Sequence, residues 1–262
     1  MIEVDPEHAA ALVERLRTAG CVFAEDEAAL LLAEAPDHGR LERMVAARVA
    51  GRPLEHVLGW VAFRGRRVVV ADGVFVPRRR TELLVDVALP RLRNGSTVVE
   101  LCCGAAAVGS ALLTEAPGPI DLWASDIDLA AVYCARRNVE PLGGHALPGD
   151  LFDGLPGALA GRVDLLLANA PYVPSASMAT MPPEAREHEA VIALDGGADG
   201  LDVQRRIIMQ TPDWLSPTGA VLIETSERQA PETAALMRAA GLTASIVRDD
   251  EFDGTVAVGV MA

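Results

Sequence analysis

The sequence contains no lysine, few aromatic residues and no long hydrophobic run, and each absence limits what the protein can be. All 23 basic residues are arginine, against 37 acidic residues, and the net charge is −14. Phosphate neutralisation dominates affinity for nucleic acids, so this balance and the scarcity of aromatics argue against stable nucleic-acid binding. No apolar run approaches the length that spans a membrane, and we expect no membrane association.

Cysteine and histidine are also scarce, with 4 and 5 residues. Their spacing matches no common metal-binding motif, so we predict no metal site. The start of the chain, Met1-Ile2-Glu3-Val4-Asp5, lacks the basic residues and apolar core of a signal peptide. We therefore expect a cytoplasmic protein, in which disulfides are rare.

The 262 residues can form one full α/β domain and a smaller unit. Residues 6–50 contain three segments with apolar residues at helical spacing. From residue 60 the period changes, and two apolar runs flank Arg64-Gly65-Arg66, which predicts a β-hairpin. We divide the chain into a helical unit at residues 1–55, a hairpin linker at 56–80 and an α/β domain at 81–262.

Strand and helix patterns alternate through the α/β domain. The predicted strands are 97–101, 120–125, 163–168, 220–225, 243–248 and 255–260, with a weaker one near Ala146-Leu147. The predicted helices are 81–92, 107–115, 129–138, 203–211 and 231–240. This alternation predicts a mainly parallel sheet covered on both faces. Because no helix separates the last two strands, they should form an antiparallel hairpin.

Acidic residues follow three of these strands, and the carboxyl ends of parallel strands are where ligands bind in such sheets. Glu100 ends the first strand and precedes a tight turn into a helix. Asp126 ends the second, where a carboxylate can accept both hydroxyls of a ribose, whereas Asp128 suits a helix cap. Asp150 follows the weak third strand, and the sequence leaves open whether it meets a ligand or lies in a surface loop.

The tetrapeptide Asn169-Ala170-Pro171-Tyr172 follows the buried strand at 163–168. An asparagine amide is planar, and the proline restricts the backbone before it, so the Asn169 side-chain oxygen and the Ala170 carbonyl can together accept from one NH2 group. The Tyr172 ring can supply a flat wall. An ordinary Asn-x-Pro turn is the alternative, but the position after Glu100, Asp126 and Asp150 favours a binding role.

These motifs carry a resemblance to known methyltransferases. The tetrapeptide resembles the Asn-Pro-Pro-Tyr motif of enzymes that methylate planar nitrogens, and residues 100–109 resemble the Asp/Glu-x-Gly-x-Gly-x-Gly loop of enzymes that use S-adenosylmethionine. Segments 53–59, 75–82 and 189–197 are similar to segments of the HemK/PrmC family. The resemblance implies the α/β, Rossmann-like fold of class I S-adenosylmethionine-dependent methyltransferases with a small N-terminal helical domain.

The HemK/PrmC family methylates the glutamine side-chain amide in the Gly-Gly-Gln motif of release factors. The resemblance implies S-adenosylmethionine as cofactor, S-adenosylhomocysteine as product, and a protein substrate such as a peptide chain release factor, bound or positioned by residues 1–55. It assigns catalysis to Asn169, Ala170, Pro171 and Tyr172. It assigns cofactor binding to Glu100, Cys102, Gly104, Ala106, Asp126, Ile127, Asp150, Leu151 and Asn169.

The chain also departs from the family pattern. Cys102 and Ala106 stand where the family often has glycine, and an added side chain there could press on the cofactor unless φ is negative. Alanine replaces proline at Ala170, although the carbonyl is kept. These departures indicate a divergent branch and leave three alternatives open: methylation of an exocyclic amine in nucleic acid, methylation of a small molecule, and a non-catalytic binding protein. The basic cluster Arg78-Arg79-Arg80 is either a solvated turn or a partner contact.

Overall fold

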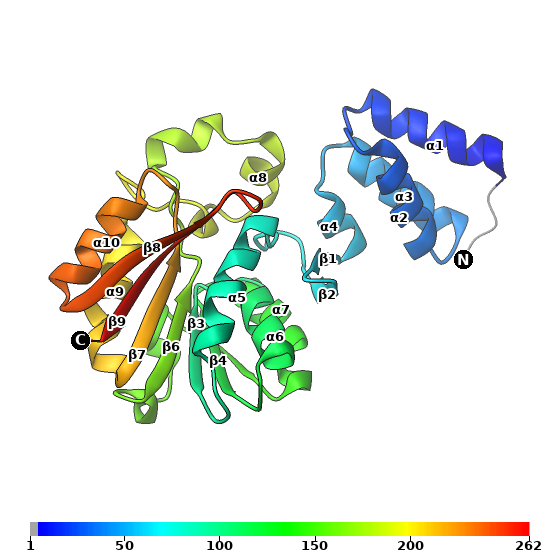
Figure 1. The fold of residues 1–262 in the computed structure, drawn as a ribbon. Coiled ribbons are helices and arrows are strands. Elements are labelled where there is room, and N and C mark those ends of the chain that lie inside the picture. Colours follow the sequence, from blue (N-terminus) through cyan, green and yellow to red (C-terminus); the bar gives the residue numbers. More distant parts are fainter. Residues whose placement is uncertain (1–4, 262) are drawn as a thin grey trace.

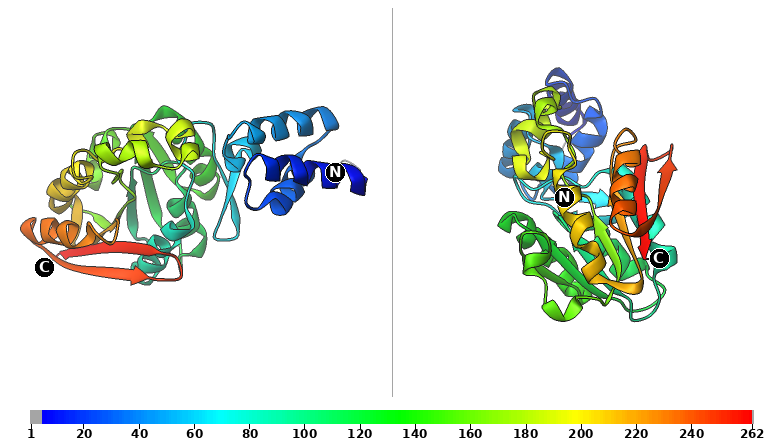
Figure 2. Two further views of the ribbon diagram at one scale, coloured as in Figure 1. Left: turned by 90° about the horizontal axis from the view of Figure 1, so that it is seen from above. Right: turned by 90° about the vertical axis from the view of Figure 1, so that its left-hand side faces the viewer.

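The computed structural model describes residues 5–261, so Met1–Val4, on which the localisation expectation rests, lie outside the described residues. The described chain forms a helical lobe and a larger α/β lobe, and the helical lobe projects to one side of the sheet (Figures 1 and 2). Within residues 5–261 no helix has the length and apolar character needed to cross a membrane.

The helical lobe has its own hydrophobic core. It consists of α1 (Pro6–Thr18), α2 (Ala24–Glu34), α3 (His38–Val49) and α4 (Leu54–Leu58). The Asp5 and Asp37 side chains cap α1 and α3 by accepting backbone N–H groups of the first turn. Leu16, Leu31 and Val45 are fully buried between the helices. The three expected helices are present, whereas α4 was not predicted because it is too short to show a helical period.

The predicted hairpin is confirmed and packs on the α/β lobe. Strands β1 (Trp60–Phe63) and β2 (Arg66–Val69) pair antiparallel. Val61, Phe63 and Val68 are buried in the core that lies between the sheet and its first helices. The hairpin therefore fixes the point at which the helical lobe leaves the larger one.

The α/β lobe is built on a seven-stranded sheet in the order β5-β4-β3-β6-β7-β9-β8. The strands are β3 (Thr97–Leu101), β4 (Asp121–Asp126), β5 (His145–Pro148), β6 (Val163–Ala168), β7 (Leu215–Glu224), β8 (Leu242–Asp249) and β9 (Gly254–Met261). The first five are parallel, and β9 lies antiparallel between β7 and β8. This is the class I methyltransferase topology, and the predicted antiparallel terminal hairpin is confirmed.

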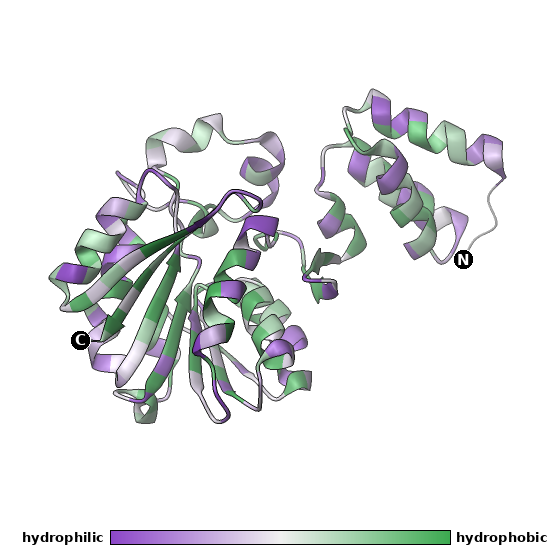
Figure 3. Ribbon diagram, viewed as in Figure 1, coloured by the Kyte–Doolittle hydropathy of each residue, from purple (hydrophilic) through white to green (hydrophobic). Residues whose placement is uncertain are grey.

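Two apolar layers enclose the sheet because successive strand residues point to opposite faces. The helices are α5 (Glu82–Ala88), α6 (Ala107–Glu115), α7 (Leu129–Val139), α8 (Pro183–His188), α9 (Asp202–Trp214) and α10 (Ala230–Ala239). Val98 and Leu165 pack with α5, α6 and α7, whereas Val99 and Leu166 pack with α9 and α10. The central strands are accordingly hydrophobic along their length (Figure 3). This packing holds the carboxyl ends of β3, β4 and β6 in fixed positions.

Candidate functional site

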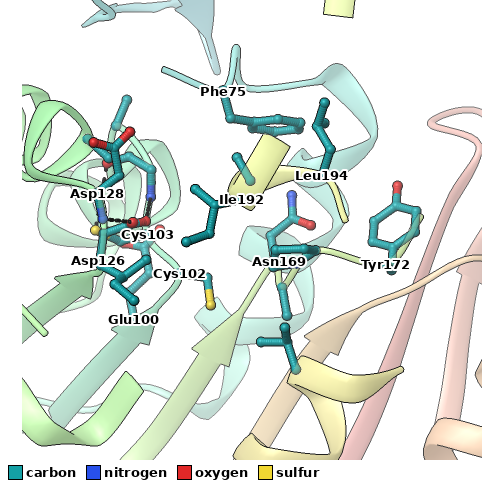
Figure 4. A pocket seen from close by; sticks show the side chains of 18 of the residues that line it. Phe75, Glu100, Cys102, Cys103, Asp126, Asp128, Asn169, Tyr172, Ile192 and Leu194 are labelled. Atoms are coloured by element: carbon teal, nitrogen blue, oxygen red, sulfur yellow. Dashed lines mark hydrogen bonds between the residues drawn. The ribbon is translucent and has the colours of Figure 1, made fainter. Parts of the chain in front are cut away.

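One cavity opens at the carboxyl ends of β3, β4 and β6. It brings together most of the residues that the sequence singled out at four separate strand ends. Figure 4 shows the acidic residues on one side of the cavity and Asn169 near its centre, with Tyr172 beyond it. The lining includes Glu100, Cys102, Gly104, Asp126, Ile127, Asp150, Leu151, Asn169, Ala170, Pro171 and Tyr172.

Glu100 anchors the turn that follows β3. Its Oε2 accepts the backbone N–H of Gly109 in α6 at 2.8 Å, which ties the strand end to the helix. The side chain is buried, and burial raises the pKa of Glu100 to about 8, although the Gly109 N–H opposes this shift. Glu100 therefore borders the cavity but already holds its own loop together.

Asp126 also holds the loop, in contrast to the expectation that its carboxylate is free. One oxygen accepts the N–H of Gly104 at 2.8 Å and the other accepts the N–H of Asp128 at 2.9 Å. Burial raises the pKa of Asp126, and these N–H donors lower it. Asp128 caps α7 as predicted, because its side chain accepts the N–H of Ala130.

Asp150 lies at the cavity edge and pairs with Arg206 of α9 at 2.8 Å. Both side chains are about half exposed, so this is a surface ion pair at the rim. The sequence suggested either a ligand contact or a surface loop for Asp150. Neither of these includes the arginine partner that the structure shows. Arg206 also lines the cavity, and nothing in its local sequence indicated that position.

The two residues that replace family glycines have different surroundings. Both adopt positive φ, 51° at Cys102 and 54° at Ala106. The expectation that a negative φ would let a side chain fit at these positions is therefore wrong. The Cys102 side chain borders the cavity, and burial raises the pKa of its thiol, which stays protonated. The structure places Ala106 instead in the core beneath α6, fully buried and away from the cavity lining. Only Cys102 can therefore press on a ligand.

The residues present fit S-adenosylmethionine, the expected cofactor. A carboxylate has about four lone-pair sites. The Asp126 carboxylate accepts two backbone N–H groups and so keeps acceptor capacity for ribose hydroxyls. Ile127 is half exposed beside it and offers an apolar surface for a ring. The acceptor carboxylate and the apolar surface beside it match the ribose and the base of a nucleoside.

Among residues 5–261, the Asn169 side chain has one hydrogen-bond partner. Its Nδ2 donates to the Thr81 hydroxyl at 3.4 Å, which directs Oδ1 away from that contact. Ala170 is buried and also borders the cavity. Burial raises the pKa of Tyr172, as does the nearby Glu224 carboxylate, whereas Arg80 lowers it. The tetrapeptide thus presents an amide oxygen and a backbone segment to the cavity, beside a tyrosine that stays neutral.

Sequence reasoning gave no role to the side chains that cover the cavity opposite the strand ends. Phe75, Ile192 and Leu194 gather there (Figure 4). Buried Glu189 joins their two segments, because its carboxylate accepts from Arg78 at 2.5 Å and from the Val76 N–H at 3.3 Å. Residues 75–82 and 189–197 both resemble family segments, and their contact in space gives that resemblance a physical reason.

The arginine cluster is not a simple solvated turn. Arg78 pairs with Glu189, and the Arg80 Nε lies 3.5 Å from Oε1 of the buried Glu224. Arg79 is the most exposed of the three and lies near Glu251. Two of these arginines therefore serve buried carboxylates at the cavity, which are 111 and 144 residues away in sequence, and no local pattern could have shown this.

The comparisons with known proteins agree with this geometry. A family model described as "Methyltransferase small domain" matches residues 66–185. The chain is 35% identical over 209 residues to the 4-amino-L-phenylalanine/4-methylamino-L-phenylalanine methyltransferase of Streptomyces pristinaespiralis, which covers 77% of this chain and 70% of that protein. The fold is shared with a methyltransferase from Pyrococcus furiosus (TM-score 0.55, 13% identity), over 86% of this chain and 100% of that one.

A relative matched over nearly the whole chain is a release factor glutamine methyltransferase of Cereibacter sphaeroides. The two sequences are 36% identical over 259 residues, which cover 92% of each chain. The match includes both lobes, the cavity and the tetrapeptide at the end of β6. This chain therefore belongs to the release factor glutamine methyltransferase (HemK/PrmC) family.

Proposed function

We propose that this protein transfers a methyl group from S-adenosylmethionine to the side-chain amide nitrogen of a glutamine in a peptide chain release factor. The supporting observation is the position of Asn169. Its amide lies at the end of β6, in the same cavity as the carboxylate of Asp126. The cavity can therefore hold a nucleoside cofactor on one side and a planar NH2 group on the other.

When bound, S-adenosylmethionine supplies a methyl group that is reactive because it is attached to a positively charged sulfur. Asp126 and Ile127 would hold the ribose and the base, and Asp150 and Leu151 would add contacts to the base. Gly104 and Cys102 line the turn beside them. Glu100 supports this turn through its hydrogen bond to Gly109.

The tetrapeptide positions the methyl acceptor. An amide nitrogen is a weak nucleophile because its lone pair is delocalised into the carbonyl. Asn169 Oδ1 and the Ala170 carbonyl each accept one hydrogen of the glutamine NH2 group, which holds the nitrogen in line for transfer and stabilises the charge that develops on it. Pro171 and Tyr172 shape the slot. No general base would be needed before transfer, because the nitrogen would attack with both hydrogens in place and lose one of them to solvent as the methyl–sulfur bond breaks.

The helical lobe gives the enzyme a surface outside the cavity. Val22 and Phe23 lie between α1 and α2 and are 83% and 68% exposed. These two adjacent side chains form a small exposed apolar patch, and exposed apolar patches mark contact surfaces. We assign residues 1–55 to contact with the protein substrate, residues 56–80 to the linker and residues 81–262 to catalysis.

The test is methyl transfer to a purified release factor, followed by mass spectrometry of the Gly-Gly-Gln peptide. Substituting Asn169→Ala should reduce kcat by roughly 10²–10³, as for loss of one transition-state contact. The matched control is Asn94→Ala, since Asn94 is exposed and lies outside the cavity. Near-normal turnover by the Asn169 variant would sink the proposed mechanism, and absence of methylation by the unmodified enzyme would sink the proposed substrate.

A small aromatic amine is a second candidate substrate. It is favoured by the relative from Streptomyces pristinaespiralis, a 4-amino-L-phenylalanine/4-methylamino-L-phenylalanine methyltransferase. The acceptor pair at Asn169 and Ala170 suits an aniline NH2 as well as an amide. Measuring kcat/KM for 4-amino-L-phenylalanine beside the release factor separates the two, because a higher value for the amine would reassign the enzyme.

A further inference from the structure

A buried carboxylate lies next to the Asn169 site, and the mechanism above does not use it. Glu224 ends β7 and is 2% exposed. Neither of its oxygens makes a hydrogen bond within the described residues, although the Arg80 Nε is 3.5 Å from Oε1. An ionisable group this deeply buried normally has partners, so its presence beside the cavity calls for an explanation.

Thr81 joins this carboxylate to Asn169. Thr81 is 3% exposed, follows Arg80 directly, and accepts the Asn169 Nδ2–H at 3.4 Å. Burial raises the pKa of Glu224, and the neighbouring Thr81 hydroxyl and Arg80 guanidinium both lower it. A hydroxyl whose oxygen accepts one hydrogen bond still has its own hydrogen to donate, and Glu224 is the acceptor beside it that lacks a partner.

An ionised Glu224, which the adjacent Arg80 guanidinium favours, gives this chain of groups one direction. Its carboxylate can only accept, so a Thr81 hydroxyl that turns towards it donates its hydrogen there and keeps its oxygen to accept from Asn169. The Asn169 amide must then turn its NH2 to Thr81 and its Oδ1 to the cavity. With the reverse direction, the cavity would face an NH2 group and would favour a carboxylate over an amide.

We propose that Thr81 and Glu224 are positioning residues that orient the Asn169 amide, so that the cavity accepts an NH2 group and rejects a carboxylate. The proposal rests on the proposed function for the identity of the substrate, but not for the orientation of Asn169. It assigns the discrimination between glutamine and glutamate side chains to two residues that act through Asn169, of which Thr81 also lines the cavity. Arg80 supports them by offsetting the charge of Glu224.

The first test needs no substrate. Side-chain amide signals of asparagine-labelled protein are recorded by NMR for the unmodified enzyme, Thr81→Val and Thr81→Ser. We expect the Asn169 NH2 signals to shift in Thr81→Val and to return towards their original positions in Thr81→Ser, which restores the hydroxyl. Thr211→Val is the matched control, because Thr211 is equally buried and its hydroxyl binds the Ile207 carbonyl within α9. Unchanged Asn169 signals in Thr81→Val would overturn the proposal.

The second test measures selection by the cavity. Peptides that contain Gly-Gly-Gln or Gly-Gly-Glu are titrated into the enzyme with S-adenosylhomocysteine present. We expect Thr81→Val to reduce the preference for the glutamine peptide by about tenfold, the value of one hydrogen bond. Thr81→Ser should recover most of that preference, and Glu224→Gln should give a partial loss, because a glutamine side chain can donate to Thr81 as well as accept from it. Affinity for S-adenosylhomocysteine should not change.

The outcomes separate this proposal from the proposed function. If the Asn169 signals respond but no release factor is methylated, the orientation holds and the substrate is wrong. If the release factor is methylated and the preference for glutamine is the same in Thr81→Val and Thr81→Ser, the orientation is not set by Thr81. Should Thr81→Val fail to fold, Thr81→Ser and Glu224→Gln carry the comparison, and equal selectivity in both and in the unmodified enzyme counts against the proposal.

Discussion

The Glu100 carboxyl makes a pH-dependent contribution to folding that can be isolated. Its pKa is about 8 in the folded protein, against an ordinary value of 4.5. Between these two pH values the unfolded chain carries an ionised carboxylate and the folded chain a protonated one, so the folded state binds the additional proton. The free energy of unfolding should therefore fall as pH rises from about 4.5 to about 8.

Comparison with Glu100→Gln isolates this effect, because the glutamine oxygen can still accept the Gly109 N–H but does not ionise. We expect the unmodified protein to lose stability relative to the variant by at most about 1.4 kcal/mol per pH unit over this window. Urea unfolding at several pH values measures the difference. Glu232→Gln, at an exposed position of α10, is the control. A difference that is constant with pH would contradict the prediction.

Single residues also show where sequence reasoning ends. Asn169 and Asp126 could be placed at the cavity because each directly follows a buried strand, and parallel strands bring their carboxyl ends to one edge. The surroundings of Ala106 could not be predicted. The path of a loop with positive φ decides whether its methyl group faces a ligand or the core. Nor could the local sequence pair Arg80 with Glu224, since the two residues come from distant segments.

At the scale of elements, the turn between β3 and α6 allows a paired test of the two glycine replacements. Cys102 borders the cavity, whereas Ala106 lies in the core. Cys102→Gly should remove side-chain bulk from the cavity and so tighten binding of S-adenosylhomocysteine by roughly threefold, less than 1 kcal/mol. Ala106→Gly should leave that affinity unchanged, since its methyl packs away from the ligand. Calorimetric titration compares the two, and equal effects would show that the turn acts through its flexibility.

The strands and long helices were predictable because their apolar periods reflect burial on one or both faces. The short elements were not. Helices α4 and α8 have 5 and 6 residues, too few for a helical period to stand out from the surrounding loops. Much of the segment between Tyr172 and Leu201 is held by contacts with distant parts of the chain, such as Glu189 with Arg78. The cover of the cavity therefore depended on tertiary contacts that no local pattern records.

At the scale of the whole molecule, Arg48 connects the helical lobe to the segment that covers the cavity. Its side chain is 10% exposed and pairs with Glu27 of α2 at 2.6 Å and with Glu184 of α8 at 2.6 Å. Glu27 is equally buried, while Glu184 is half exposed. The two contacts therefore differ in kind: the first is internal to the helical lobe, and the second joins the two lobes.

Substitution at either end of this contact should separate the two roles. In Arg48→Met the Glu27 carboxylate stays buried without its partner, and the helical lobe should lose roughly 3–5 kcal/mol of stability. Glu184→Gln keeps the Arg48–Glu27 pair and should cost less than about 1 kcal/mol, because Glu184 is solvated. Hydrogen exchange then distinguishes the outcomes. Arg48→Met should speed exchange throughout α1, α2 and α3, whereas Glu184→Gln should speed it in α8 and leave the helical lobe protected. Faster exchange in the helical lobe of Glu184→Gln would mean that this lobe depends on the cavity cover for its own stability.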